Sequence, residues 1–114
     1  MLVLSDFFPR GIHAIFTDRH SSFSLADGQL SLTPVQEKAA AAYLSIPDSI
    51  FIPLRQVHGN RILVYERGAP GLPTSADADG CLTRSPRCWL GVKTADCLPV
   101  FLCDSRNHCI GIVH

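Results

Sequence analysis

The sequence predicts a strand-rich fold of the α/β or α+β class. Short apolar runs separated by Gly, Pro, Asn and Asp recur along most of the 114 residues, and such runs are typical of strands. One segment carries good helix signals instead. Thr33 can cap it, Pro34 suits the first helical position, and Gln36 completes a Thr-x-x-Gln capping box. We therefore expect several short strands and at least one helix.

The chain begins with an entry segment over residues 1–11. A polar, turn-rich loop is expected over 18–32 and a Gly/Pro/Ala-rich loop over 66–78. The helix should start at Pro34 and end before Pro47. A tight turn, His58-Gly59-Asn60, should lead into a return strand, and Pro53 argues for an edge or a bulge. The expected strands before the final hairpin are 13–18, 29–32 (weak), 50–57, 61–65, 80–83 and 89–93.

The last part of the sequence predicts a β-hairpin. An apolar run follows Cys97, the turn Asp104-Ser105-Arg106-Asn107 interrupts it, and a second apolar run over 109–113 returns to His114. If Cys103 and His108 close a four-residue loop, Cys97 lies directly opposite His114. Side chains paired in this way are about 4.5–5.5 Å apart at Cβ. A thiolate and an imidazole at that distance can share a metal or a proton.

Composition limits the kinds of partner. The chain is 46% hydrophobic and 18% charged, and ten basic residues balance ten acidic ones. We therefore expect a globular protein without a nucleic-acid or anionic-membrane partner. No apolar run approaches the roughly 20 residues of a membrane span, and the amino terminus lacks the pattern of a signal peptide.

Five cysteines without a Cys-x-x-Cys pair favour reduced thiols in a cytoplasmic protein. The sequence stops at His114, inside an expected strand. We therefore expect a fragment of a longer protein.

His58, Cys97 and His114 each lie at an expected strand end or turn. Side chains from separate strands can converge at such positions, and nitrogen, sulfur and nitrogen donors suit zinc. Three protein ligands would leave the fourth position open to water, which is the pattern of a catalytic site. The alternative is that Cys97 is a small buried hydrophobic residue and that the histidines cap turns.

Four charged residues near these positions are further candidates. Asp96 can orient an imidazole or act as a general base, or it can satisfy turn amides. Lys93 and Arg55 can bind an anion such as phosphate, or they can be solvated. Asp79 lies in a turn that enters a strand, and it can also line a pocket.

Four motifs occur in order, and together they carry a family resemblance. They are Gln56-Val57-His58-Gly59-Asn60, Ala78-Asp79-Gly80-Cys81-Leu82-Thr83, the run from Gly91 to Val100 that contains Lys93-Thr94-Ala95-Asp96-Cys97, and Gly111-Ile112-Val113-His114. From about residue 50 to 114 the chain closely resembles the laccase-domain family. These proteins were once called multicopper polyphenol oxidases and are now seen as zinc-dependent purine nucleoside phosphorylases.

The resemblance implies a zinc ion held by His58, Cys97 and His114, with copper as the lesser expectation. It also implies an α/β fold, a mixed-sheet sandwich flanked by helices. Residues 1–114 would be a single laccase-type domain, its N-terminal half, incomplete at the C-terminus. The sequence departs from the family pattern at Lys93, where arginine is usual, and over 16–23, where an early family motif is largely missing.

The implied activity is phosphorolysis of adenosine, inosine, guanosine and S-methyl-5′-thioadenosine, together with deamination of adenosine. The partners would be a small nucleoside and phosphate. Cys97, Asp96, His58 and His114 would be catalytic, and Lys93, Arg55 and Asp79 would bind substrate.

Three alternatives remain open. Cys97 activated by His114 and oriented by Asp96 would make a cysteine hydrolase. Copper-dependent phenol oxidation would need more ligands than the sequence offers. The chain can also be a truncated fragment without turnover.

Overall fold

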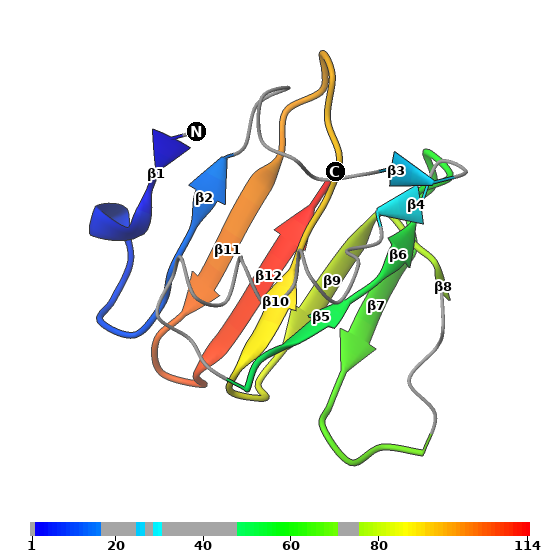
Figure 1. The fold of residues 1–114 in the computed structure, drawn as a ribbon. Helices are drawn as coiled ribbons and strands as arrows, with labels where there is room; N and C mark the ends of the chain where they lie inside the picture. The colour runs from blue at the N-terminus through cyan, green and yellow to red at the C-terminus, as the bar shows by residue number, and fades with distance from the viewer. Residues whose placement is uncertain (1, 17–24, 27–28, 31–47, 71–75) are drawn as a thin grey trace.

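The computed structural model describes residues 2–16, 25–26, 29–30, 48–70 and 76–114 (Figure 1). These residues form short strands, in mixed parallel and antiparallel pairs, and one 3-10 turn. The elements are β1 (Leu2–Val3), η1 (Ser5–Phe7), β2 (Ile15–Phe16), β3 (Leu25–Ala26), β4 (Gln29–Leu30), β5 (Ile50–Ile52), β6 (Leu54–Arg55), β7 (Ile62–Tyr65), β8 (Ala76–Asp77), β9 (Gly80–Thr83), β10 (Cys88–Leu90), β11 (Val100–Asp104) and β12 (Cys109–Val113).

The sheet with the longest strands has four of them, in the order β11-β12-β9-β7 (Figure 1). β12 pairs antiparallel with both β11 and β9, whereas β7 pairs parallel with β9. The same pairing brings the end of β12 beside the start of β9, since Val113 lies opposite Gly80. The last residue, His114, is thereby placed next to Asp79.

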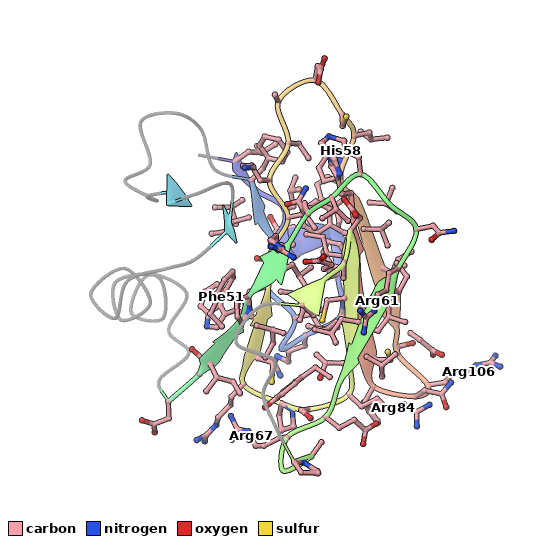
Figure 2. All side chains as sticks on the ribbon, turned by 90° about the vertical axis from the view of Figure 1, so that its right-hand side faces the viewer. Phe51, His58, Arg61, Arg67, Arg84 and Arg106 are labelled. Carbon is pink, nitrogen blue, oxygen red and sulfur yellow. The ribbon has the colours of Figure 1, made fainter. Side chains whose placement is uncertain are left out.

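The second layer contains β5 and β10, which pair in parallel, and Figure 2 shows it beside the four-stranded sheet. Pro53 separates β5 from β6, and β6 joins a different sheet, in the order β3-β4-β6-β8. The core lies between the layers, and its buried members are Ile52, Leu54, Tyr65, Ala78 and Cys81. Partly buried Ile50, Leu63, Cys88, Leu90 and Val92 pack against them.

The other face of the four-stranded sheet is apolar and open in the described part of the chain. Strand alternation places Val64, Leu82 and Leu102 on this outer face. Val64 is 65% exposed and Leu102 is 45% exposed. Gly111, on β12, lies between Leu82 of β9 and Leu102 of β11 on the same face, and a Cβ there would collide with the Leu82 side chain.

Most expected strands are confirmed, and the class is a strand-rich mixed fold. The bounds 80–83 and 109–113 are those of β9 and β12, and Pro53 does interrupt the strand expected over 50–57. The helix expected from Pro34 lies outside the described residues. None of the described residues forms a helix long and apolar enough to cross a membrane.

The pairing of the return strand differs from the simple hairpin that the turn at 58–60 suggested. β7 does not pair with β5 or β6 but lies parallel to β9, in the other layer. Backbone hydrogen bonds explain why the chain changes sheets here. The β8–β9 connection binds both arms of the turn: Ala78 N donates to Arg55 O at 3.1 Å and Asp79 N donates to Arg61 O at 3.0 Å.

The expected hairpin exists, but its register is shifted by two residues. Asp104 pairs with Cys109 and Val100 pairs with Val113, so His114 follows the last pair and Cys97 lies beyond the strand start. The cause is the turn chemistry. Asp104 stays in the strand and its Oδ1 accepts hydrogen bonds from Arg106 N at 2.9 Å and Asn107 N at 3.2 Å. His108, with φ of 50°, then takes the left-handed conformation that completes the turn.

Candidate metal and nucleoside site

A buried carboxylate organises the turn that carries His58. Asp79 is 2% exposed. Its Oδ2 accepts hydrogen bonds from Val57 N at 3.2 Å and Gly59 N at 2.8 Å, and its Oδ1 accepts one from His58 N at 2.9 Å. Three successive backbone N–H groups thus point at one anion, an arrangement that favours negative charge. His58 itself has a φ of 57°, and these hydrogen bonds offset the strain of that conformation.

The same carboxylate also reaches His114. His114 Nδ1 lies 3.3 Å from Asp79 Oδ1, and its backbone N–H donates to Asp79 O at 2.7 Å. The His114 side chain is only 8% exposed. The imidazole rings of His58 and His114 lie edge to face, with centroids 5.2 Å apart and planes at 74°. Two of the three predicted zinc ligands are therefore neighbours.

The charge of Asp79 follows from its partners. Burial alone would raise the pKa of its carboxyl group. Hydrogen bonds from Gly59, Val57, His114 and His58 together outweigh that effect, so the pKa is lowered below its ordinary value. Asp79 is consequently an anion at neutral pH, and it favours a proton on Nδ1 of His114. The Nε2 atom of that ring is then left with a lone pair.

Gln56 ties the His58 turn to the segment that leads to Cys97. Its Oε1 accepts a hydrogen bond from Lys93 N at 2.6 Å, and its Nε2 donates to Lys93 O at 2.9 Å. These two contacts fix the backbone of Lys93 beside the turn. The loop between β10 and β11 leaves from this point, at the same end of the molecule as His58 (Figure 2).

Cys97 is not gathered with the two histidines. It is exposed, and its Sγ lies 3.9 Å from Asp96 Oδ1. Within the described ranges, no three His, Cys, Asp or Glu side chains are arranged to hold a metal ion. The reading of Cys97 as a buried hydrophobic residue is wrong, because the loop that carries it projects from the start of β11.

The two predicted anion-binding cations have different surroundings. The Arg55 guanidinium forms an ion pair with Asp77, and both side chains are about half exposed. That pair raises the pKa of Arg55 and, through its hydrogen bond, lowers that of Asp77. Because of this ion pair, Arg55 would have to share its charge with Asp77 when it binds an anion. Lys93 has its backbone fixed by Gln56.

Comparison with known families supports the resemblance of the four motifs. The profile described as multi-copper polyphenol oxidoreductase laccase matches residues 13–114. The chain belongs to this family. The matched range includes Gln56, His58, Asp79, Lys93, Cys97 and His114.

Curated relatives of the chain are named purine nucleoside phosphorylases. The Mycobacterium tuberculosis protein is 36% identical over 74 residues, which are 65% of this chain and 29% of the relative. The Deinococcus radiodurans protein is 34% identical over 97 residues, 83% of this chain and 36% of the relative. The Streptomyces griseus protein is 30% identical over 118 residues, 90% of this chain and 46% of the relative. The chain thus spans less than half the length of these relatives, and no solved structure matches it significantly.

The other four cysteines of this laccase-family chain lie in strands. They are Cys81, Cys88, Cys103 and Cys109, and all five cysteines are free thiols. Burial raises the pKa of Cys81 to about 12. Cys81 therefore stays a neutral, packed thiol.

A cavity of about 1120 Å³ has a lining that does not include the histidine pair. Residues 8–16 and β10 contribute to that lining, as do Phe51, Phe101 and Lys93. None of His58, Asp79, His114 or Cys97 lines it. We place the candidate site at the histidine pair, because the buried charge and the converging rings are there and the cavity is largely apolar.

The sequence does not predict two sets of contacts at the site. They are those of Gln56 with the Lys93 backbone and those of Asp79 with the His58 turn and His114. Their partners lie 37 and 35 residues away in the sequence, so local patterns contained no signal for either contact. The one available hint is that both residues belong to the four motifs that carry the family resemblance.

Proposed function

We propose that this chain carries the zinc site of a purine nucleoside phosphorylase. The observation that supports this most strongly is the edge-to-face pair of His58 and His114, assembled on the buried Asp79. The pair occurs in a chain whose family includes relatives named purine nucleoside phosphorylase. Substrates, metal and turnover of this chain are part of the proposal.

The donors present fit zinc in chemical type. Imidazole nitrogen and thiolate sulfur are both zinc ligands, and three protein ligands with one open position are the pattern of a catalytic zinc site. His58 and His114 already face one another, and Cys97 lies on the exposed loop that starts beside them. In the proposal, Cys97 is the third ligand and its loop supplies it. When bound, zinc would supply a Lewis acid beside the reacting nucleoside.

The chemistry proposed is phosphorolysis. A phosphate oxygen forms a bond to the anomeric carbon of the sugar, the bond from that carbon to the purine nitrogen breaks, and the purine leaves with the electron pair and takes up a proton. Lys93 and Arg55 would hold the phosphate, since their charge opposes that of the nucleophile. Asp96, next to Cys97, would hold or pass a proton. Deamination of adenosine, as a second activity, belongs to the same proposal.

The test compares phosphate-dependent and phosphate-independent product formation. The full chain, supplied with zinc and adenosine, should release adenine and ribose 1-phosphate only when phosphate is added. Inosine should be followed in the same samples to detect deamination. His58→Ala should lose the activity, and His108→Ala should keep it. His108 is a matched control because it also has a positive φ in an exposed turn. Phosphate-dependent purine release that is absent, or equal in the two variants, contradicts the proposal.

A further inference from the structure

The contacts of Asp79 differ from those of a substrate-binding residue and from those of a residue that only caps a turn. It is 2% exposed, and both of its carboxylate oxygens are already engaged by backbone N–H groups and by His114. A carboxylate has about four acceptor positions, and four donors reach this one. No acceptor remains for a substrate hydroxyl. The structure therefore argues against the substrate-binding role expected from the sequence.

The fourth donor distinguishes Asp79 from a residue that only caps a turn. Asp104 is such a cap: its donors are Arg106 N, Asn107 N and Asn107 Nδ2, all within three residues. Asp79 instead joins a turn 20 to 22 residues upstream to an imidazole 35 residues downstream. It also fixes the backbone of His114, whose N–H donates to Asp79 O.

The Asp79 carboxylate sets the positions of both histidines. Asp79 Oδ1 receives both His58 N and His114 Nδ1, so a single oxygen sets the position of one imidazole through its backbone and of the other through its ring. Contact at Nδ1 leaves Nε2 of His114 as the atom able to bind a cation. A carboxylate behind a ligand histidine fixes the tautomer and orientation of that ring.

We propose that Asp79 is the positioning residue of the His58–His114 pair, holding the proton of His114 on Nδ1 so that Nε2 can bind the metal. This inference rests on the proposed function for the metal it names. Its structural content, the tautomer and the shared oxygen, can be measured without nucleoside or phosphate. The two proposals can therefore fail separately.

The first test uses the unmodified full chain without metal. Long-range ¹H–¹⁵N correlation spectra at about pH 8, above the ordinary imidazole pKa of about 6.5, report which ring nitrogen carries the proton. His114 should be protonated on Nδ1 and bare on Nε2. A proton on Nε2 of His114 would overturn the proposal, and no variant is needed for this result.

The second test measures zinc affinity by competition with a chromophoric chelator. Asp79→Asn offers one acceptor oxygen and one NH₂ group where four donors converge, so zinc should bind about 10–100-fold more weakly. Asp104→Asn is the matched control, because it also weakens a turn cap but touches no histidine; it should stay within about twofold of the wild type, below the loss expected for an outer-sphere partner. A folded Asp79→Asn variant with wild-type affinity, or a wild type that binds no zinc, would overturn the proposal. Normal zinc binding without phosphorolysis would instead contradict only the proposed function.

Discussion

Asp79 Oδ1 and His114 Nδ1 lie 3.3 Å apart, and both side chains are almost fully buried, at 2% and 8% exposure. This contact joins the start of β9 to the end of β12, because the antiparallel pairing of those strands sets the two residues side by side. The sheet thus supplies the rigid base of the candidate site. The adjacent turn supplies His58 by wrapping its backbone around the same carboxylate.

Replacing Gln56 should loosen the segment that leads to Cys97. Gln56→Ala removes both side-chain hydrogen bonds to the half-buried Lys93 backbone, and at about 0.5–1.5 kcal/mol each the loss should be about 1–3 kcal/mol. Amide hydrogen exchange should become faster at Lys93. Gln56→Glu keeps an acceptor for Lys93 N but sets a carboxylate oxygen against Lys93 O. Because two acceptors repel, exchange at Lys93 should become faster in this variant too. Unchanged exchange at Lys93 in Gln56→Ala would show that the contact does not hold this segment.

Thiol labelling should separate Cys97 from Cys81. Cys97 is exposed, whereas Cys81 is buried and has its pKa raised to about 12. Since the thiolate is the reactive form, iodoacetamide should modify Cys97 first and Cys81 last, as followed by peptide mass spectrometry. Added zinc should protect Cys97 if it is a ligand. Rapid labelling of Cys97 that zinc does not slow would favour the cysteine-hydrolase alternative.

Alkaline pH should destabilise the fold through Cys81. Its pKa is about 12 in the folded protein against 9.0 as the ordinary value. Between these limits the unfolded chain has released the proton and the folded chain keeps it, so the free energy of unfolding should fall as pH rises above 9. Urea denaturation at about pH 8 and pH 10 would measure this fall. It should be smaller in Cys81→Ala and unchanged in Cys97→Ala; equal falls in all three proteins would contradict the assignment.

Two glycines of the four-stranded sheet should differ in their tolerance of alanine. A Cβ at Gly80 would lie 2.9 Å from the backbone oxygen of Ile112, which cannot move freely. At Gly111 the tightest contact is with the tip of the Leu82 side chain, which can rotate away. Gly80→Ala should therefore cost about 1–3 kcal/mol, and Gly111→Ala should cost less. Chemical denaturation measures the free energy of unfolding of both variants. A larger loss of stability in Gly111→Ala than in Gly80→Ala would contradict the prediction.

The sequence predicted the local elements better than their assembly. The bounds of β9 and β12 could be predicted because the apolar runs at 80–83 and 109–113 are limited by clear turn residues. The parallel pairing of β7 with β9 could not, because nothing in the run 61–65 distinguishes a hairpin partner from a strand of the other layer. The hairpin register failed for a similar reason. Whether Asp104 ends the strand or begins the turn depends on hydrogen bonds of its own side chain.

Donor chemistry selects His58, Cys97 and His114 as zinc ligands. The structure brings the two histidines together and leaves Cys97 exposed on its loop. The role of Asp79 could not be predicted, since a carboxylate before a strand is as compatible with a surface turn as with a buried anion. Its burial follows from the pairing of β12 with β9, which is a property of the tertiary fold.

X-ray absorption at the zinc edge is the most direct measurement of the proposed site. The full chain loaded with one equivalent of zinc should show one sulfur at about 2.3 Å and two nitrogens at about 2.0–2.1 Å. Cys97→Ser should lose the sulfur contribution, and Cys103→Ser should retain it. A zinc shell without sulfur, or one that persists unchanged in Cys97→Ser, would contradict a zinc ion shared by His58, Cys97 and His114.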